Sequence, residues 1–357
     1  MTIPKVLLIT PDFQISGGVS EFNKILVKYS KQEITPFVVY SAGRNMFFLW
    51  SFLLLIYDLI RFTIQTFSLR YNIVHINPSL GKTSILRDSV FVWVAKLYGK
   101  KVFVHWHGWN PDNEYLLNKY KIFLSKTMFK ANHIKFLASS FQNQIRRVGF
   151  KNKTSLGNTF IDDQLLELGL QKKNKSEKFN ILFLSTISKN KGIYEALETY
   201  QVLKGKYPNI CLTIAGVGKE LQLVKNLVKD KNITEVEFKG FVSGMEKSQT
   251  YINADIYLFP SYYEGMPTTV IEAMGFGIPV ICSSVGALPD FFINGEMGFI
   301  LENSNDNEYA DAIKKLINNK DLRTEIGSFN CKYTQEHFLA SKTAAKIDEV
   351  YCELTND

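Results

Sequence analysis

The chain has 357 residues, enough for two domains of ordinary size, and its 46% hydrophobic and 21% charged content is typical of a globular soluble or membrane-surface protein. Its cysteines are scattered and form no C-x-x-C pair, which argues against a zinc site and a disulfide framework and indicates a reduced compartment. They are Cys211, Cys282, Cys331 and Cys352. The first apolar run is only strand-length and is followed at once by Pro11 and Asp12, so we expect no signal peptide.

The net charge of +8 is unevenly distributed along the chain. Residues 1–160 hold 21 Lys and Arg against 7 Asp and Glu, a net charge of +14, whereas residues 161–357 hold 21 against 27, a net charge of −6. This asymmetry predicts an anionic partner for the first half. Because the sequence has no nucleic-acid-binding motif, an anionic membrane surface or a lipid diphosphate fits better than nucleic acid.

Residues 5–10 form an apolar run that predicts a first buried strand. A loop containing Gly17 and Gly18 follows, and then a helix from about residue 21 to residue 30. A strand, a glycine loop and a helix in this order place backbone amides where a phosphate can bind. A plain turn explains a lone Gly-Gly pair equally well.

Residues 46–57 are the most apolar run in the sequence. The run is too short to span a bilayer, but past Asp58 it continues to residue 67 as one long predicted helix. One interpretation is a buried core helix. The other is a helix in the membrane interface, with Trp50 inserted and three arginines holding anionic headgroups, so that residues 44–70 contact an anionic membrane. These arginines are Arg44, Arg61 and Arg70.

The rest of the first half alternates predicted strands and helices. The strands are residues 72–77, 101–106 and 132–139, and the helices are residues 84–98 and 141–148. His107 directly follows the second of these strands, at the edge of a parallel sheet where ligands bind. His75 and His105 lie within strands and are predicted to be core residues or to support ligand-contacting residues from behind.

The second half repeats this plan after a polar run at residues 171–178 that predicts a linker. Predicted strands are residues 179–185, 210–216, 236–239, 256–260 and 277–284, and residues 333–354 predict a final helix. The first of these strands leads into a loop that ends at Gly192 and opens a helix near residue 193. In this loop Lys191 is placed to pair with a diphosphate, although a solvated lysine is the alternative.

Residues 261–274 read as a tight loop followed by a helix that starts at Pro267. The backbone N–H groups of Thr268 and Thr269 would then form an anion site, helped by the positive end of the helix dipole. Glu264 and Glu272 frame the site, and carboxylates accept hydrogen bonds from sugar hydroxyls. In this arrangement the amides would bind a diphosphate, and the acid on each side would bind one of two sugars, which suits a nucleotide-sugar. The alternative is that both acids are solvated.

The surrounding residues follow the pattern E-G-x-P-x-x-x-x-E-A-x-x-x-G-x-P-V. They are Glu264, Gly265, Pro267, Glu272, Ala273, Gly277, Pro279 and Val280. The sequence therefore resembles the family 4 retaining glycosyltransferases, which have the α/β GT-B fold. The resemblance implies two doubly wound Rossmann-like domains facing a cleft: residues 1–160 for the acceptor and the membrane, and residues 161–334 for the nucleotide-sugar. Residues 335–357 would be a helix returning to the first domain.

The same resemblance implies the roles of the site residues. His107 and Glu264 would be catalytic, Glu264 holding hydroxyls of the donor sugar and steadying its cationic transition state, while Glu272 holds the ribose. The implied donor-binding residues are Gly17, Gly18, Lys191, Gly265, Met266, Pro267, Thr268, Thr269 and Glu272. One position departs from the family, because the usual Gly-Arg before the phosphate-binding lysine is Ser185-Thr186 here. The expected arginine is therefore missing at Thr186.

The predicted reaction transfers a sugar from a nucleoside diphosphate, UDP in preference to GDP, to a glycan acceptor with retention. No D-x-D triplet occurs in the sequence, so we expect metal-independent transfer. The basic, apolar first half favours a lipid-linked acceptor and a peripheral protein on the cytoplasmic face of the membrane, in bacterial capsule or lipopolysaccharide synthesis. The alternatives are a nucleotide-sugar epimerase of the same fold and a non-catalytic nucleotide-sugar-binding protein.

Overall fold

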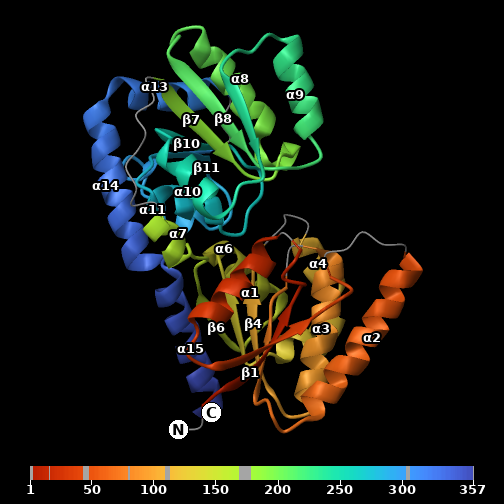
Figure 1. The fold of residues 1–357 in the computed structure, drawn as a ribbon. Coiled ribbons are helices and arrows are strands. Elements are labelled where there is room, and N and C mark those ends of the chain that lie inside the picture. The colour runs from red at the N-terminus through yellow and green to blue at the C-terminus, as the bar shows by residue number, and fades with distance from the viewer. Residues whose placement is uncertain are drawn as a thin grey trace. The chain divides into compact units, whose positions relative to one another are not determined.

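The computed structural model describes residues 3–15, 17–42, 48–78, 81–108, 113–168, 178–302 and 306–356. The chain divides into two compact units, each built on its own six-stranded sheet (Figure 1). Unit 1 comprises Met1–Thr159 and Ala340–Asp357, and unit 2 comprises Phe160–Leu339. The predicted linker at residues 171–178, apart from Lys178, and Arg44 lie outside the described residues.

Unit 1 has a parallel sheet with strand order β2-β1-β3-β4-β5-β6. The strands are β1 (Lys5–Thr10), β2 (Glu33–Val38), β3 (Ile73–Ile76), β4 (Lys101–Trp106), β5 (His133–Phe136) and β6 (Lys153–Leu156). The helices are α1 (Gly18–Tyr29), α2 (Phe48–Phe67), α3 (Lys82–Leu97), α4 (Asn113–Lys119), α5 (Lys121–Lys126), η1 (Met128–Lys130) and α6 (Ser139–Val148). All residues of β3 and β5 are buried, as expected for a parallel sheet covered on both faces.

Unit 2 has a second parallel sheet, with strand order β12-β11-β10-β7-β8-β9. Its strands are β7 (Phe179–Leu184), β8 (Ile210–Ala215), β9 (Val236–Gly240), β10 (Ile256–Phe259), β11 (Val280–Ser283) and β12 (Gly298–Leu301). Its helices are α7 (Asp163–Leu168), η2 (Lys189–Lys191), α8 (Ile193–Lys204), α9 (Leu221–Asp230), α10 (Gly244–Ile252), α11 (Thr268–Gly275), α12 (Leu288–Phe291), α13 (Asp306–Asn318) and α14 (Lys320–His337). Alternate residues of β7 enter two different apolar clusters, because successive side chains of a strand point to opposite faces.

The chain ends in two helices where the sequence predicted one. That prediction, a single helix over residues 333–354, is wrong, because α14 ends at His337 and α15 (Ala340–Asn356) begins three residues later. Between them Leu339 forms an isolated parallel bridge with Ile161, which takes the chain out of helical geometry. α15 belongs to unit 1 and packs against α1, β3 and β4.

α2 is not the buried core helix that one interpretation proposed. Over Leu49–Phe67 only 17% of the residues are buried. Residues 46–57 continue into one long helix, as predicted, and its 19-residue stretch Leu49–Phe67 is long and apolar enough to cross a membrane by length and composition.

Candidate functional site

The loop at residues 260–267 connects β10 to α11 and carries the first acid of the motif. Pro267 caps α11 with extended backbone, and its carbonyl accepts from the N–H groups of Val270 at 3.2 Å and Ile271 at 3.4 Å. The helix therefore starts where the proline predicted, with its amide end and the positive end of its dipole directed at the loop.

A second loop fixes the backbone around Glu264 from the other side. The N–H of Ala287 donates to the carbonyl of Gly265 at 2.8 Å. Gly286 has φ of +61°, and a Cβ there would lie 2.3 Å from the Gly265 carbonyl oxygen. Only glycine allows this close approach, so the site loop is held by its contact with Gly286.

Glu264 is ion-paired to Lys191 across two loops. The Lys191 Nζ lies 2.6 Å from the Glu264 Oε1, which also accepts from the Ser261 hydroxyl at 2.8 Å. The Glu264 side chain is 9% exposed, so its alternative interpretation as a solvated loop residue does not hold. The sequence predicted both residues for the site but not their contact.

The η2 segment that carries Lys191 is pinned to the same loop. The N–H of Tyr262 and the hydroxyl of Ser261 both donate to the Asn190 carbonyl, at 2.9 and 3.1 Å. Gly192 has φ of +75°, and a Cβ there would lie 1.9 Å from the Pro260 carbonyl oxygen. These contacts fix the lysine relative to the acid.

Glu272, the second acid of the motif, is 4% exposed within α11, so it is not a surface residue. Its Oε1 lies 2.5 Å from the Lys247 Nζ, and its Oε2 accepts from the Tyr251 hydroxyl at 2.7 Å. Burial raises the pKa of Tyr251 well above its ordinary value, so the phenol remains a donor. Sequence reasoning missed Lys247 and Tyr251; their i, i+4 spacing on α10 was visible, but nothing in the sequence pairs α10 with α11.

Thr269, one of the predicted amide donors, is tied to the sheet by its side chain. The Tyr257 hydroxyl donates to the Leu184 carbonyl at 2.8 Å and lies 2.8 Å from the Thr269 Oγ1. In the other loop Thr186, where the family carries arginine, is exposed, and so is Lys189. Lys191 of the same loop, by contrast, lies directly beside Glu264.

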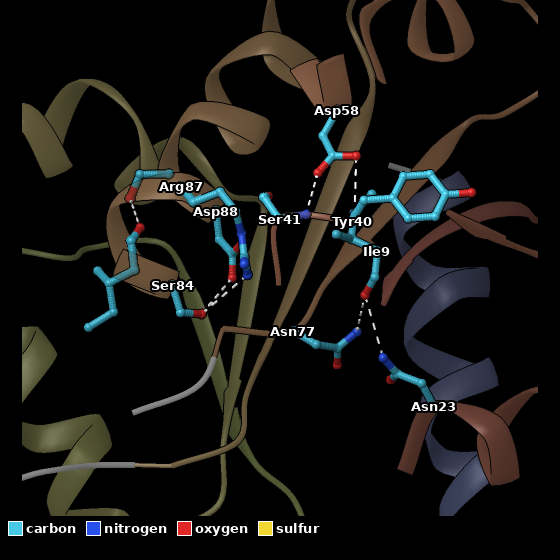
Figure 2. A network of polar contacts seen from close by, with 11 residues as sticks. Ile9, Asn23, Tyr40, Ser41, Asp58, Asn77, Ser84, Arg87 and Asp88 are labelled. Atoms are coloured by element: carbon cyan, nitrogen blue, oxygen red, sulfur yellow. Dashed lines mark hydrogen bonds and ion pairs between the residues drawn. The ribbon is translucent and has the colours of Figure 1, made fainter. Parts of the chain in front are cut away.

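In unit 1, His107 follows β4 and is held in one tautomer. The Asn77 Nδ2 donates to the Ile9 carbonyl at 3.2 Å (Figure 2), which turns the Asn77 Oδ1 toward the ring. This oxygen lies 2.8 Å from the His107 Nε2, so Nε2 carries the proton and Nδ1 keeps a lone pair. Burial lowers the pKa of His107 to about 3, so the imidazole is neutral.

Gly17 and Gly18 lie at the start of α1, with Gly17 as the N-cap residue. A Cβ at either position would meet no atom within 4 Å, so neither glycine is required by packing among the described residues. His75 and His105, predicted to be core residues, are fully buried, which confirms that interpretation.

Comparison with known structures defines the class of fold. Over 99% of both chains the structure superposes on a sucrose-phosphate synthase from Thermosynechococcus elongatus with a TM-score of 0.78 and 18% identity. Anabaena Alr3699/HepE, solved in complex with UDP and glucose, matches with a TM-score of 0.74 and 15% identity over 97% of this chain and 99% of that one. The structure is thus a two-domain α/β protein of the GT-B fold, as predicted.

The sequence comparisons show which known proteins unit 2 is similar to. Residues 169–332 match the model of the glycosyl transferases group 1 family. The capsular polysaccharide biosynthesis glycosyltransferase CapM of Staphylococcus aureus is 26% identical over 238 residues, which are 65% of this chain and 58% of CapM. The chain matches about half the length of the first curated relatives.

Proposed function

We propose that the protein is a family 4 retaining glycosyltransferase that moves a sugar from a nucleoside diphosphate, UDP in preference to GDP, to a glycan acceptor. The observation that carries the proposal is the paired arrangement in unit 2, where both acids of the motif are nearly buried and each is bound to a lysine. Proteins rarely bury charges at such cost without a use for them. The match to the group 1 family model and the named relatives support the same activity.

Lys191 would neutralise the leaving diphosphate. Its ammonium has three N–H donors, and Glu264 accepts one of them. The remaining donors, with the amides at the start of α11, suit two phosphate groups. Because these groups supply positive charge without a metal ion, we propose metal-independent transfer.

Glu264 would act on the donor sugar. The bond between the sugar C1 and the diphosphate oxygen breaks, the acceptor oxygen bonds to C1, and the acceptor proton passes to the departing phosphate. A fixed carboxylate beside C1 stabilises the positive charge that develops there and orients the sugar hydroxyls. In unit 1, the His107 Nδ1 lone pair can accept a hydrogen bond from a further hydroxyl. Because the pKa of His107 is about 3, the ring is neutral and does not serve as a general acid.

Glu272 would hold the ribose of the donor. Lys247 and Tyr251 each occupy one of its oxygens, and a carboxylate oxygen retains a second lone pair for a ribose hydroxyl. Lys247 and Tyr251 are positioning residues, since they act on the donor through Glu272.

The acceptor we propose is lipid-linked, such as a polyprenyl-diphosphate oligosaccharide, in bacterial surface polysaccharide synthesis. CapM, a capsular polysaccharide glycosyltransferase, supports the setting. The charge of +14 on residues 1–160 supports an anionic acceptor. Such an acceptor requires a peripheral protein on the inner face of the cell membrane.

One experiment separates the proposal from its alternatives. The protein is incubated with a panel of UDP- and GDP-sugars, with and without lipid-linked acceptor, and the released nucleoside diphosphate is measured. Acceptor-dependent release supports a transferase, whereas an epimer formed without acceptor identifies an epimerase. Tight donor binding, seen as a raised melting temperature without turnover, identifies a binding protein, which the missing arginine at Thr186 would explain.

A further inference from the structure

α2 has its apolar side chains on the outside. Exposed apolar residues recur along it at helical spacing, and two exposed aromatic residues, Trp50 and Tyr57, lie beside them. The recurring residues are Leu49, Phe52, Leu53, Ile56, Ile60, Ile64 and Phe67. Trp50 is 59% exposed and Ile64 is 68% exposed. Figure 1 shows α2 as the outermost helix of its layer, alongside α3. A surface helix normally presents the opposite pattern.

The two charged residues of α2 point inward. Asp58 is fully buried and accepts from the backbone N–H groups of Tyr40 at 3.2 Å and Ser41 at 2.9 Å (Figure 2). The Arg61 guanidinium lies 3.4 Å from Asp58 and donates to the Val38 carbonyl at 3.3 Å. The charges that make this helix amphipathic therefore serve to attach it to the end of β2.

Two threonine hydroxyls of α2 also donate within the helix. Thr63 donates to the Leu59 carbonyl at 2.7 Å, and Thr66 donates to the Phe62 carbonyl at 2.6 Å. The protons of these two hydroxyls are thus not available to a partner.

α3 extends this surface. The rings of Phe67 and Tyr98 meet edge to face with centroids 5.7 Å apart. Trp93 and Leu97, in the last turns of α3, are exposed as well. We call the exposed apolar residues of α2 and these three residues the α2–α3 face.

We propose that the α2–α3 face docks onto a lipid bilayer by inserting apolar side chains, with little contribution from anionic headgroups. α2, which carries most of the face, is about 30 Å long, from twenty residues at about 1.5 Å each. It has an apolar surface and no outward charge on α2, which complements acyl chains. The Trp and Tyr residues of the face combine an apolar ring with one polar atom, the chemistry favoured at a membrane interface. They are Trp50, Tyr57, Trp93 and Tyr98. This inference needs neither the donor nor the proposed reaction.

The contacts of Asp58 argue against a helix that crosses the bilayer. A spanning α2 would separate its carboxylate from the amides of Tyr40 and Ser41 and expose a charge to hydrocarbon. A helix attached along its inner face instead lies in the plane of the interface.

Two of the three arginines that predicted an anionic preference, Arg61 and Arg70, contact groups of the protein itself, and the third, Arg44, lies outside the described residues. Arg61 packs against three aromatic rings, with its Cζ 4.8 Å from the centroids of Phe37 and Tyr40 and 5.3 Å from that of Tyr57. Arg70 pairs with Glu33 at 3.5 Å. Electrostatic docking would lose most of its strength in salt, whereas apolar insertion would not.

Vesicle flotation tests the inference. The full-length protein is floated with neutral phosphatidylcholine vesicles and with vesicles that also contain phosphatidylglycerol, at low salt and at about 1 M salt, where the screening length is about 3 Å. We expect binding to both vesicle types that persists at high salt. Binding that requires phosphatidylglycerol and disappears in salt would overturn the inference, and so would absence of binding or a dimer that buries this face.

A double variant locates the contact. Ile60→Glu with Ile64→Glu changes two exposed helical positions, so the fold should survive, and a melting curve checks this. Vesicle partitioning should fall at least about tenfold, because each acid must be withdrawn from the apolar interface. The control Leu223→Glu changes an exposed apolar residue of α9 in unit 2 and should have no effect. Equal partitioning by the double variant and the control would refute the location.

A spectroscopic readout complements flotation. Bromine-labelled acyl chains quench tryptophans that enter the bilayer. We expect quenching of the wild type and a clearly smaller effect in Trp50→Phe and in Trp93→Phe. Quenching unchanged in both variants would refute insertion of the α2–α3 face.

Discussion

The Nζ of Lys191 lies 2.6 Å from the Oε1 of Glu264, although the two residues are 73 positions apart in sequence. Each group lowers the cost of burying the other, since an unpaired charge in either position would be desolvated without compensation. The pair also joins the two chemical tasks of the proposed reaction, because one member suits the phosphates and the other suits the sugar. Loss of either member should therefore affect both tasks.

Glu264→Gln is the most direct test of the proposed catalytic role. The amide keeps the size of the side chain and can still accept from Ser261, but it has no charge to stabilise a cationic transition state. We expect kcat/KM for transfer to fall at least about 100-fold. Steady-state kinetics measure this, with Glu296→Gln, at an exposed turn position of unit 2, as the matched control. Turnover near that of the wild type would remove Glu264 from the mechanism.

Lys247 and Tyr251 should control donor affinity. Tyr251→Phe and Lys247→Met each remove one donor to the buried Glu272 carboxylate, at a cost of about 1 to 3 kcal/mol. We expect the KM for the nucleotide-sugar to rise at least about fivefold in each variant, with a smaller change in kcat. Lys314→Met breaks an exposed ion pair with Asp311 on α13 and serves as the control. A fall in kcat at unchanged KM would contradict a positioning role.

The strands and the motif helix were predictable because they depend on local sequence. The apolar runs at Lys5–Thr10 and Lys101–Trp106 became β1 and β4 with the expected bounds, and α11 begins directly after Pro267. A strand of a parallel sheet is buried on both faces, so its sequence is a continuous apolar run that can be recognised without the structure. A proline at a helix start is equally local.

Contacts between distant segments were not predictable. The pairing of Lys247 with Glu272 depends on how α10 lies against α11, and no local pattern encodes that. The same is true of α2, whose composition suits a core helix and a membrane-facing helix equally well. Its orientation is determined by the burial of Asp58 against the amides of Tyr40 and Ser41.

The tautomer of His107 can be measured directly. Long-range proton–nitrogen NMR correlations should show a protonated Nε2 and an unprotonated Nδ1 at neutral pH, because the Asn77 Oδ1 accepts from Nε2. In Asn77→Asp a carboxylate replaces this oxygen, and an adjacent negative charge favours the imidazolium. The pKa of His107 should then rise from about 3. A protonated Nδ1 in the wild type, or a pKa unaltered in the variant, would contradict the assigned contact.

Acid should destabilise unit 1 through its buried histidines. The pKa of each of His75, His105, His107 and His133 is lowered, chiefly by burial, from the ordinary value of 6.5. Below pH 6.5 the unfolded chain binds protons at these positions and the folded chain does not, so the free energy of unfolding falls as the pH falls. Each histidine contributes a slope of about 1.4 kcal/mol per pH unit, continuing to about pH 4 for His133 and about pH 3 for His107. Asp348, whose pKa burial raises, acts in the opposite direction at the acid end.

Tryptophan fluorescence isolates this effect, because all four tryptophans lie in the sequence of unit 1. Unfolding followed by fluorescence between pH 7 and pH 4.5 should show a steep loss of stability. His105→Phe provides the matched variant: neither ring nitrogen of His105 has a hydrogen-bond partner among the described residues, and its ring already packs against Phe22 and Phe103. The variant should lose about 1.4 kcal/mol per pH unit of the acid dependence. An acid slope that is the same in His105→Phe and in the wild type would show that this histidine is already charged in the folded protein.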